Sequence, residues 1–136
     1  MKSVLLYSCE TWKTSKIIQN KLQTFVNRCL RRILKIRWPD ITNSELWKIT
    51  NQKEITIEIK RRKWNWIGHT IRKEDGAVER MALDWNPRGS RTRGRPKNTW
   101  KRTVLEEIAR EGKTWSEVKK LATNRVRWRH FVNVLY

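Results

Sequence analysis

The sequence is poor in acidic residues and has no long apolar run. Its 136 residues include 13 Asp and Glu against 32 Lys and Arg, which gives a formal net charge of +19. A compact chain with this imbalance repels itself, and a polyanion such as nucleic acid relieves the repulsion. No apolar run approaches the roughly 20 residues of a membrane-spanning helix, and the apolar stretch at residues 4–7 is too short for a signal peptide. We therefore expect a nucleic-acid partner, no membrane, and an intracellular, nuclear location.

Motifs of known catalytic sites are also missing. The sequence contains no Walker loop, no GxGxxG and no HExxH. A polymerase or nuclease holds its Mg²⁺ ions with two or three clustered carboxylates. The adjacent acidic residues here, Glu74-Asp75 and Glu106-Glu107, fit charge balance on a helix surface or turn. We expect no enzymatic activity from this chain by itself, and no cofactor.

Cysteine and histidine are too few and too widely spaced to indicate a metal site. The chain has Cys9, Cys29, His69 and His130, whose successive spacings of 20, 40 and 61 residues match no short pair of zinc ligands. In a reducing compartment, two cysteines are more often buried thiols than a disulfide. The sequence therefore predicts neither a structural metal nor a disulfide.

The spacing of apolar residues predicts an all-α fold, an irregular helical bundle in two parts. Apolar residues recur every three or four positions over most of the chain, which is typical of amphipathic helices. Ile55, Ile57 and Ile59 alternate as in a strand, but no partner strand is visible and the helical spacing continues after them. Helices are predicted at about residues 14–37, 42–50, 56–74, 98–111 and 114–135, with a short segment at 77–83.

Capping residues predict where these helices begin. Thr42 and Thr114 are each followed three residues later by a glutamate, the pattern of a capping box. Asn98 or Thr99 is the predicted N-cap of the helix after Pro96.

Two helices have apolar stripes that we expect to be buried. The first long helix should bury Ile18, Leu22, Phe25, Cys29, Ile33 and Ile36, and Val26 and Leu30 widen this stripe. The last helix, predicted as one continuous element, should bury Trp115, Val118, Leu121, Ala122, Trp128, Phe131 and Leu135.

A basic linker, residues 86–97, separates the two predicted parts of the chain. Its prolines and glycines forbid a helix and extend the backbone. Residues 86–102 contain seven Lys or Arg and no acid, and Arg among Gly and Pro can approach phosphates closely. The predicted nucleic-acid contacts are Arg88, Arg91, Arg93, Arg95, Lys97, Lys101 and Arg102.

A second basic cluster consists of Lys60, Arg61, Arg62 and Lys63. Four consecutive residues run around a whole helical turn, so they cannot all face one phosphate chain. Nucleic-acid contact and a solvated helix face are equally good interpretations of this cluster.

Nine tryptophans are many for a chain of this size. In a basic protein each can be a core anchor, a cation-π partner of Arg or a stacking surface for a base. We predict a core role for most of them. Trp100 lies beside Lys101 but shares an apolar stripe with Val104 and Ile108, which favours the core over base stacking.

Several segments together resemble the carboxy-terminal region of reverse transcriptases from non-LTR retrotransposons, close to the RTE-like lineage. They cover nearly the whole chain, and the most specific are the WNWIGH box and GRPKNTW with its upstream WNP. Relatives in that family usually have Gly where this chain has Ser8, and Gly is common where it has Lys35. The segments are LLYSCETW (5–12), LQTFVNRCLRRILKIRWPD (22–40), ELWKIT (45–50), RRKWNWIGHTIRKED (61–75), ALDWNPRGSRTRGRPKNTWKRTV (82–104) and the helix from Trp115 to Trp128.

The resemblance implies a division of the chain into four segments. Residues 1–40 correspond to a thumb-like helical segment, 41–85 to a post-thumb segment, 86–97 to the basic linker and 98–136 to a C-terminal helical pair. The paired aspartates of the palm, usually in a (Y/F)xDD box, do not occur in this sequence, nor do the endonuclease residues. The family's catalytic residues therefore cannot be transferred.

Three functional interpretations follow. The first is a non-catalytic fragment, a degenerate copy or a separate reading frame that binds the phosphate backbone of RNA or DNA. The second is a helical module that docks on the missing polymerase palm of a parent polypeptide. The third is a transposon relic without a selected function.

Overall fold

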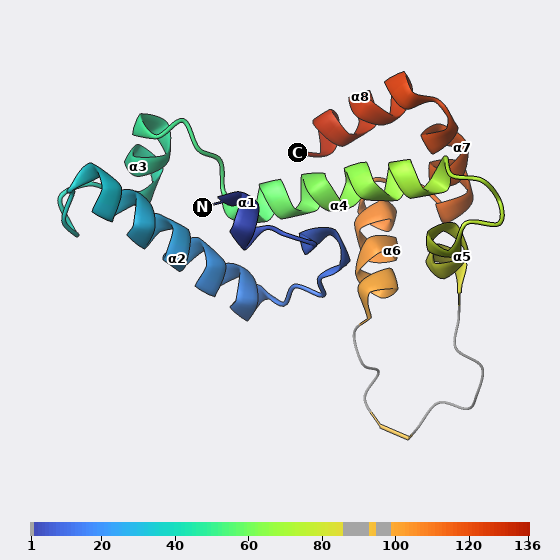
Figure 1. Ribbon diagram of the computed structural model, residues 1–136, viewed down its shortest axis with the longest axis horizontal. Helices are drawn as coiled ribbons and strands as arrows, with labels where there is room; N and C mark the ends of the chain where they lie inside the picture. Colours follow the sequence, from blue (N-terminus) through green and yellow to red (C-terminus); the bar gives the residue numbers. More distant parts are fainter. Residues whose placement is uncertain (1, 86–92, 95–98) are drawn as a thin grey trace. The chain divides into compact units, whose positions relative to one another are not determined.

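The chain folds into helices, as the apolar spacing predicts. The computed structural model describes residues 2–85, 93, 94 and 99–136, and within these residues it contains eight α-helices, one short 3-10 helix and no strand. The all-α prediction is confirmed. Figure 1 labels the α-helices. The elements are α1 (Lys2–Leu5), η1 (Cys9–Thr11), α2 (Lys16–Leu34), α3 (Asn43–Ile49), α4 (Ile55–Ile71), α5 (Val78–Asp84), α6 (Trp100–Arg110), α7 (Trp115–Thr123) and α8 (Arg125–Leu135).

The chain consists of two compact units, Met1–Arg62 and Lys63–Tyr136. The boundary therefore lies inside α4, whereas the sequence places the division at the basic linker, residues 86–97. The reason is that the helices before and after the linker share one core: Leu83 of α5 and Val104 of α6 belong to the same buried cluster. The helices before and after the linker thus belong to the same unit.

The predicted helix starts are largely confirmed by side-chain caps. The hydroxyls of Thr42 and Thr114 accept hydrogen bonds from the backbone amides of Glu45 and Glu117. The two glutamate side chains accept in return from the threonine amides, which completes a capping box at each helix. Thr99, one of the two predicted candidates, caps α6 by accepting the amide of Arg102 at 3.2 Å. These caps satisfy amides that a helix leaves without an internal partner.

The first unit buries only part of the predicted apolar stripe of α2: Val26 is in the core, and Leu22 and Leu30 pack against it. Phe25 and Ile33 are 48% and 68% exposed, whereas Val26 is buried together with the polar residues Asn27 and Arg31. These two polar side chains can be buried because each hydrogen-bonds to α3 or to the segment before it. The core cluster of this unit contains Leu6, Cys9, Val26, Ile55 and Ile59.

The second unit packs α5, α6, α7 and α8 around the C-terminal half of α4 (Figure 1). Trp64 and Trp128 are fully buried at its centre, with ring centroids 5.9 Å apart, and Phe131 lies against both rings. Gly68 of the WNWIGH box is buried on α4, and a methyl group at this position would clash with the Trp128 indole. The glycine is therefore required by packing, although glycine weakens a helix.

The predicted last helix is in fact two helices. α7 ends at Thr123, and the Asn124 side chain accepts the amides of Val126 and Arg127, both at 3.0 Å. Asparagine favours such a cap over the helix interior, so it begins α8 at this point. The apolar stripe does not reveal this break, because the buried residues of α7 and α8 continue at the same helical spacing.

Three residues with side chains occupy left-handed backbone conformations in the described part of the chain, and one of them is Asn51 with φ of 48°. Ser8 and Lys35 both have φ of 55°, a region that glycine enters at little cost and other residues do not. Lys35 ends α2, and the amide of the next residue, Ile36, donates to the carbonyl of Arg31 at 3.0 Å. This geometry is that of a helix C-terminus at which glycine is the preferred residue.

We expect Lys35→Gly to raise the free energy of unfolding by about 0.5–1 kcal/mol, because it removes the steric cost of the left-handed backbone. The matched control is Lys21→Gly, the same substitution at an exposed position inside α2, which should lower it by about 1 kcal/mol. Urea unfolding of both variants measures the difference. Destabilisation by both substitutions would show that position 35 is not left-handed in solution.

Candidate nucleic-acid interface

The basic linker lies mostly outside the described residues. Arg88, Arg91, Arg95 and Lys97 are not among those the structure describes, so their part in binding stays a prediction. Arg93 is described and is exposed. The following Gly94 has φ of 128°, a conformation that favours glycine.

Lys101 and Arg102 lie in the first turn of α6, which contains no acidic residue. The positive end of a helix dipole favours anions, so two cations at this end concentrate positive charge. Arg102 is within 3.1 Å of Glu106 one turn later, but both side chains are about half exposed, and such surface pairs contribute little. The start of α6 therefore suits a phosphate group.

The second basic cluster is only partly at the surface. Lys60, Arg61 and Arg62 are half-buried on α4. Arg62 lies 3.3 Å from Glu58, an exposed pair one turn apart on the same helix. These three residues stay predicted contacts, with the charge of Arg62 partly balanced.

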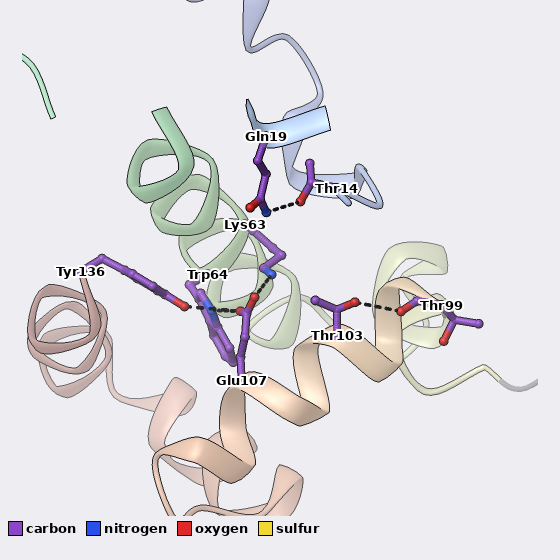
Figure 2. A network of polar contacts seen from close by, with 8 residues as sticks. All are labelled: Thr14, Gln19, Lys63, Trp64, Thr99, Thr103, Glu107 and Tyr136. Atoms are coloured by element: carbon purple, nitrogen blue, oxygen red, sulfur yellow. Dashed lines mark hydrogen bonds and ion pairs between the residues drawn. The ribbon is translucent and has the colours of Figure 1, made fainter. Parts of the chain in front are cut away.

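Lys63 is a structural residue in the second unit, contrary to its predicted place in the interface. It is 7% exposed, and its ammonium lies 2.7 Å from the Glu107 carboxylate (Figure 2). The other oxygen of this carboxylate accepts hydrogen bonds from Trp64 Nε1 at 2.9 Å and from the Tyr136 hydroxyl at 3.4 Å. Burial and the neighbouring Glu107 raise the pKa of Tyr136. The sequence shows the charge of Lys63 but not this distant acid that neutralises it.

Most of the tryptophans have the predicted core role. Trp100 packs against the core of the second unit and meets Trp66 edge-to-face at 6.0 Å, which agrees with the core interpretation. Trp38 and Trp85 are the exceptions among the described residues, with 67% and 68% of their surface exposed. Periodicity could not predict their exposure. Both residues precede a proline by one or two positions, so neither lies on a helical stripe whose buried side can be assigned.

The structure also gathers three arginines that the sequence analysis did not assign to a site. Arg28, Arg31 and Arg32 of α2 line a cavity of about 670 Å³ together with Trp38. Their spacing of three and four residues on one helix is the signal that could have indicated it.

The described residues contain no group of three His, Cys, Asp or Glu placed to hold a metal ion. Cys9 and Cys29 are free thiols, and burial raises the pKa of Cys9 to about 11. No helix in the described part of the chain has both the length and the apolar character to cross a membrane.

Comparison with known proteins gives one weak similarity. The chain is 23% identical over 133 residues to an uncharacterized transposon-derived protein of Caenorhabditis elegans; the match covers 91% of this chain and 48% of the relative, so the chain spans about half of that protein. No protein-family profile matches, and no solved structure does. The similarity is consistent with a transposon origin.

Replacement of Glu107 tests the buried network. Glu107→Gln should lower the free energy of unfolding by about 3 kcal/mol, because it leaves the Lys63 ammonium buried without a counter-charge. The adjacent Glu106→Gln makes the same change in an exposed pair and should cost less than about 0.5 kcal/mol. Equal losses in chemical denaturation would contradict a buried role for Glu107.

Proposed function

We propose that the chain is a nucleic-acid-binding C-terminal fragment of a retrotransposon-derived reverse transcriptase, and that it has no polymerase or endonuclease activity of its own. The observation that carries this proposal is the run of seven Lys and Arg without an acid between residues 86 and 102. It leads directly into the acid-free first turn of α6.

Two similarities support this origin, the first for a reverse transcriptase and the second for a transposon. The WNWIGH and GRPKNTW segments resemble the tail of non-LTR reverse transcriptases, and the relative from Caenorhabditis elegans is described as transposon-derived. The chain lacks the paired palm aspartates, so any role in reverse transcription is one of binding.

The mode of binding follows from the type of residue. Guanidinium groups along an extended backbone contact successive phosphates, which carry no sequence information. The start of α6 adds Lys101, Arg102 and the dipole of an eleven-residue helix. The overall excess of 19 positive charges draws the polyanion from a distance. Binding should therefore be strong at low salt and independent of sequence.

A salt titration tests this function. With about six phosphates contacted, the logarithm of affinity for duplex DNA should fall with the logarithm of salt concentration at a slope near −5. Replacing Arg91, Arg93 and Arg95 with Ala should weaken binding to all sequences and make the slope shallower by about 2.7. Helical content should not change.

The charge-matched control replaces Arg125, Arg127 and Arg129, which are exposed on α8, with Ala. It should alter the slope much less than the linker variant. Equal effects of the two triple variants would contradict a localised site, and absence of binding to both RNA and DNA at low salt would refute the function.

An exposed apolar face of α2 favours a second candidate, a module that docks on the polymerase palm of a parent polypeptide. Ile18, Phe25 and Ile33 are exposed and recur at spacings of seven and eight residues, so they lie on one face of the helix. Exposed apolar stripes of this kind are typical of protein interfaces.

Substitution of this face distinguishes the two candidates. The double variant Phe25→Gln, Ile33→Gln should reduce self-association and binding of a hydrophobic dye without lowering the free energy of unfolding, because neither residue is in the core. Val26→Ala, on the buried face, should instead cost about 2 kcal/mol. A wild-type chain that is monomeric and binds no dye would argue against the docking role.

A further inference from the structure

A cavity in the first unit lies between the C-terminal half of α2 and the segment that leads into α3. Its volume is about 670 Å³, which is within the usual range of small-ligand pockets, about 300–1,000 Å³. Most of the side chains around it are basic, amide or aromatic, the others are Thr24 and Ile36, and no acid is among them. They include Asn27, Arg28, Arg31, Arg32, Trp38 and Asn43.

Arg31 is the unusual residue of this cavity, because it is a buried cation with an unused donor. It is 8% exposed. Its Nη2 donates to the Ile41 carbonyl at 2.9 Å and to Asn43 Oδ1 at 3.1 Å, whereas its Nη1 is buried and has no acceptor. A buried charged donor without a partner is costly, so such a group calls for an explanation such as a missing ligand.

Trp38 lies against the same guanidinium group. The Arg31 guanidinium carbon is 4.8 Å from the centroid of the Trp38 ring. Trp38 is nevertheless 67% exposed, so part of its indole is available to a planar ring from solvent. Arg28 and Arg32 are exposed beside it, one turn apart on α2.

The walls of the cavity are held by hydrogen bonds within the first unit. Asn27 Oδ1 accepts from Trp47 Nε1 of α3 and from Gln23 Nε2, both at 2.8 Å. Gln23 Oε1 in turn accepts a hydrogen bond from the backbone amide of Ile55, the first residue of α4, at 2.7 Å. The binding groups are therefore carried by a fixed frame and need little ordering when a ligand enters.

We propose that this cavity binds one unstacked nucleotide of a single-stranded nucleic acid. The phosphate oxygen accepts from Arg31 Nη1 and lies between Arg28 and Arg32, while the base stacks on Trp38. Three cations select a phosphate group, and the exposed indole selects a planar ring next to it. A duplex does not fit, since its bases are already stacked and paired. This inference rests on the proposed function in taking nucleic acid as the ligand, but its site is separate from the basic linker.

The test compares a single-stranded ten-nucleotide oligomer with the duplex of the same sequence, using the full chain. Trp38→Ala should weaken binding of the single strand about tenfold and change binding of the duplex less than twofold. Trp38→Phe should restore most of the loss. Thermal unfolding should change little, because most of the Trp38 side chain is exposed and its contact with Arg31 lies at the edge of the cavity.

Charge is tested separately. Arg28→Gln with Arg32→Gln should make the salt slope for the single strand shallower by about 1.4, as expected for two lost phosphate contacts. The controls are Lys16→Gln with Lys21→Gln, which remove two exposed charges from the same helix, and Phe25→Ala, which removes an exposed aromatic residue outside the cavity. Neither control should reproduce these effects.

Three outcomes would overturn the nucleotide site. The first is equal binding of the oligomer by the wild type and by Trp38→Ala. The second is an equal loss of affinity for the single strand and the duplex in that variant. The third is tight saturable binding of thymidine monophosphate, which would make the cavity a site for free nucleotides. The linker variant decides the proposed function independently. If Trp38→Ala has no effect but the linker substitutions weaken binding, only the cavity is refuted.

Discussion

The Glu107 carboxylate joins three elements of the second unit. It pairs with Lys63 of α4, accepts from Trp64 of the same helix and from Tyr136 after α8, and itself belongs to α6. In a chain with 13 acids and 32 basic residues, few carboxylates are available to balance a cation inside. The excess of basic residues that leaves the surface positive therefore also leaves the buried Lys63 dependent on one carboxylate, that of Glu107, for its counter-charge. Most of the remaining positive charge stays where a polyanion can reach it.

Helices and their starts were predictable because their determinants are local. A capping box lies within four residues, so Thr42 and Thr114 could be assigned from the sequence alone. The break at Asn124 is also local, but its signal competes with a continuous apolar stripe. The burial of Asn27 and Arg31 on α2 was not predictable, since these residues are buried only through partners in or before α3. Periodicity shows where apolar residues gather, not which polar residues find a partner.

The candidate sites also divide into those that the sequence predicts and those that depend on distant contacts. The basic linker is visible in the sequence because charge, proline and glycine occur together in one segment. The role of Lys63 is not, because its counter-charge is 44 residues away. The cavity at the end of α2 depends on Trp38, which reaches Arg31 only after the helix has ended at Lys35. A site built by a chain reversal brings together residues that no single stripe or motif contains.

The close approach of Gly68 to Trp128 limits how the sequence can drift. Since a methyl group at position 68 has no room beside the indole, no larger residue fits there unless position 128 becomes smaller at the same time. The two positions are on helices far apart in sequence, so independent point changes rarely satisfy this condition. Among copies of a mobile element, those that have lost the glycine but kept the tryptophan would be the ones that can no longer assemble this core. A change at this single codon would then be enough to mark a copy as decayed.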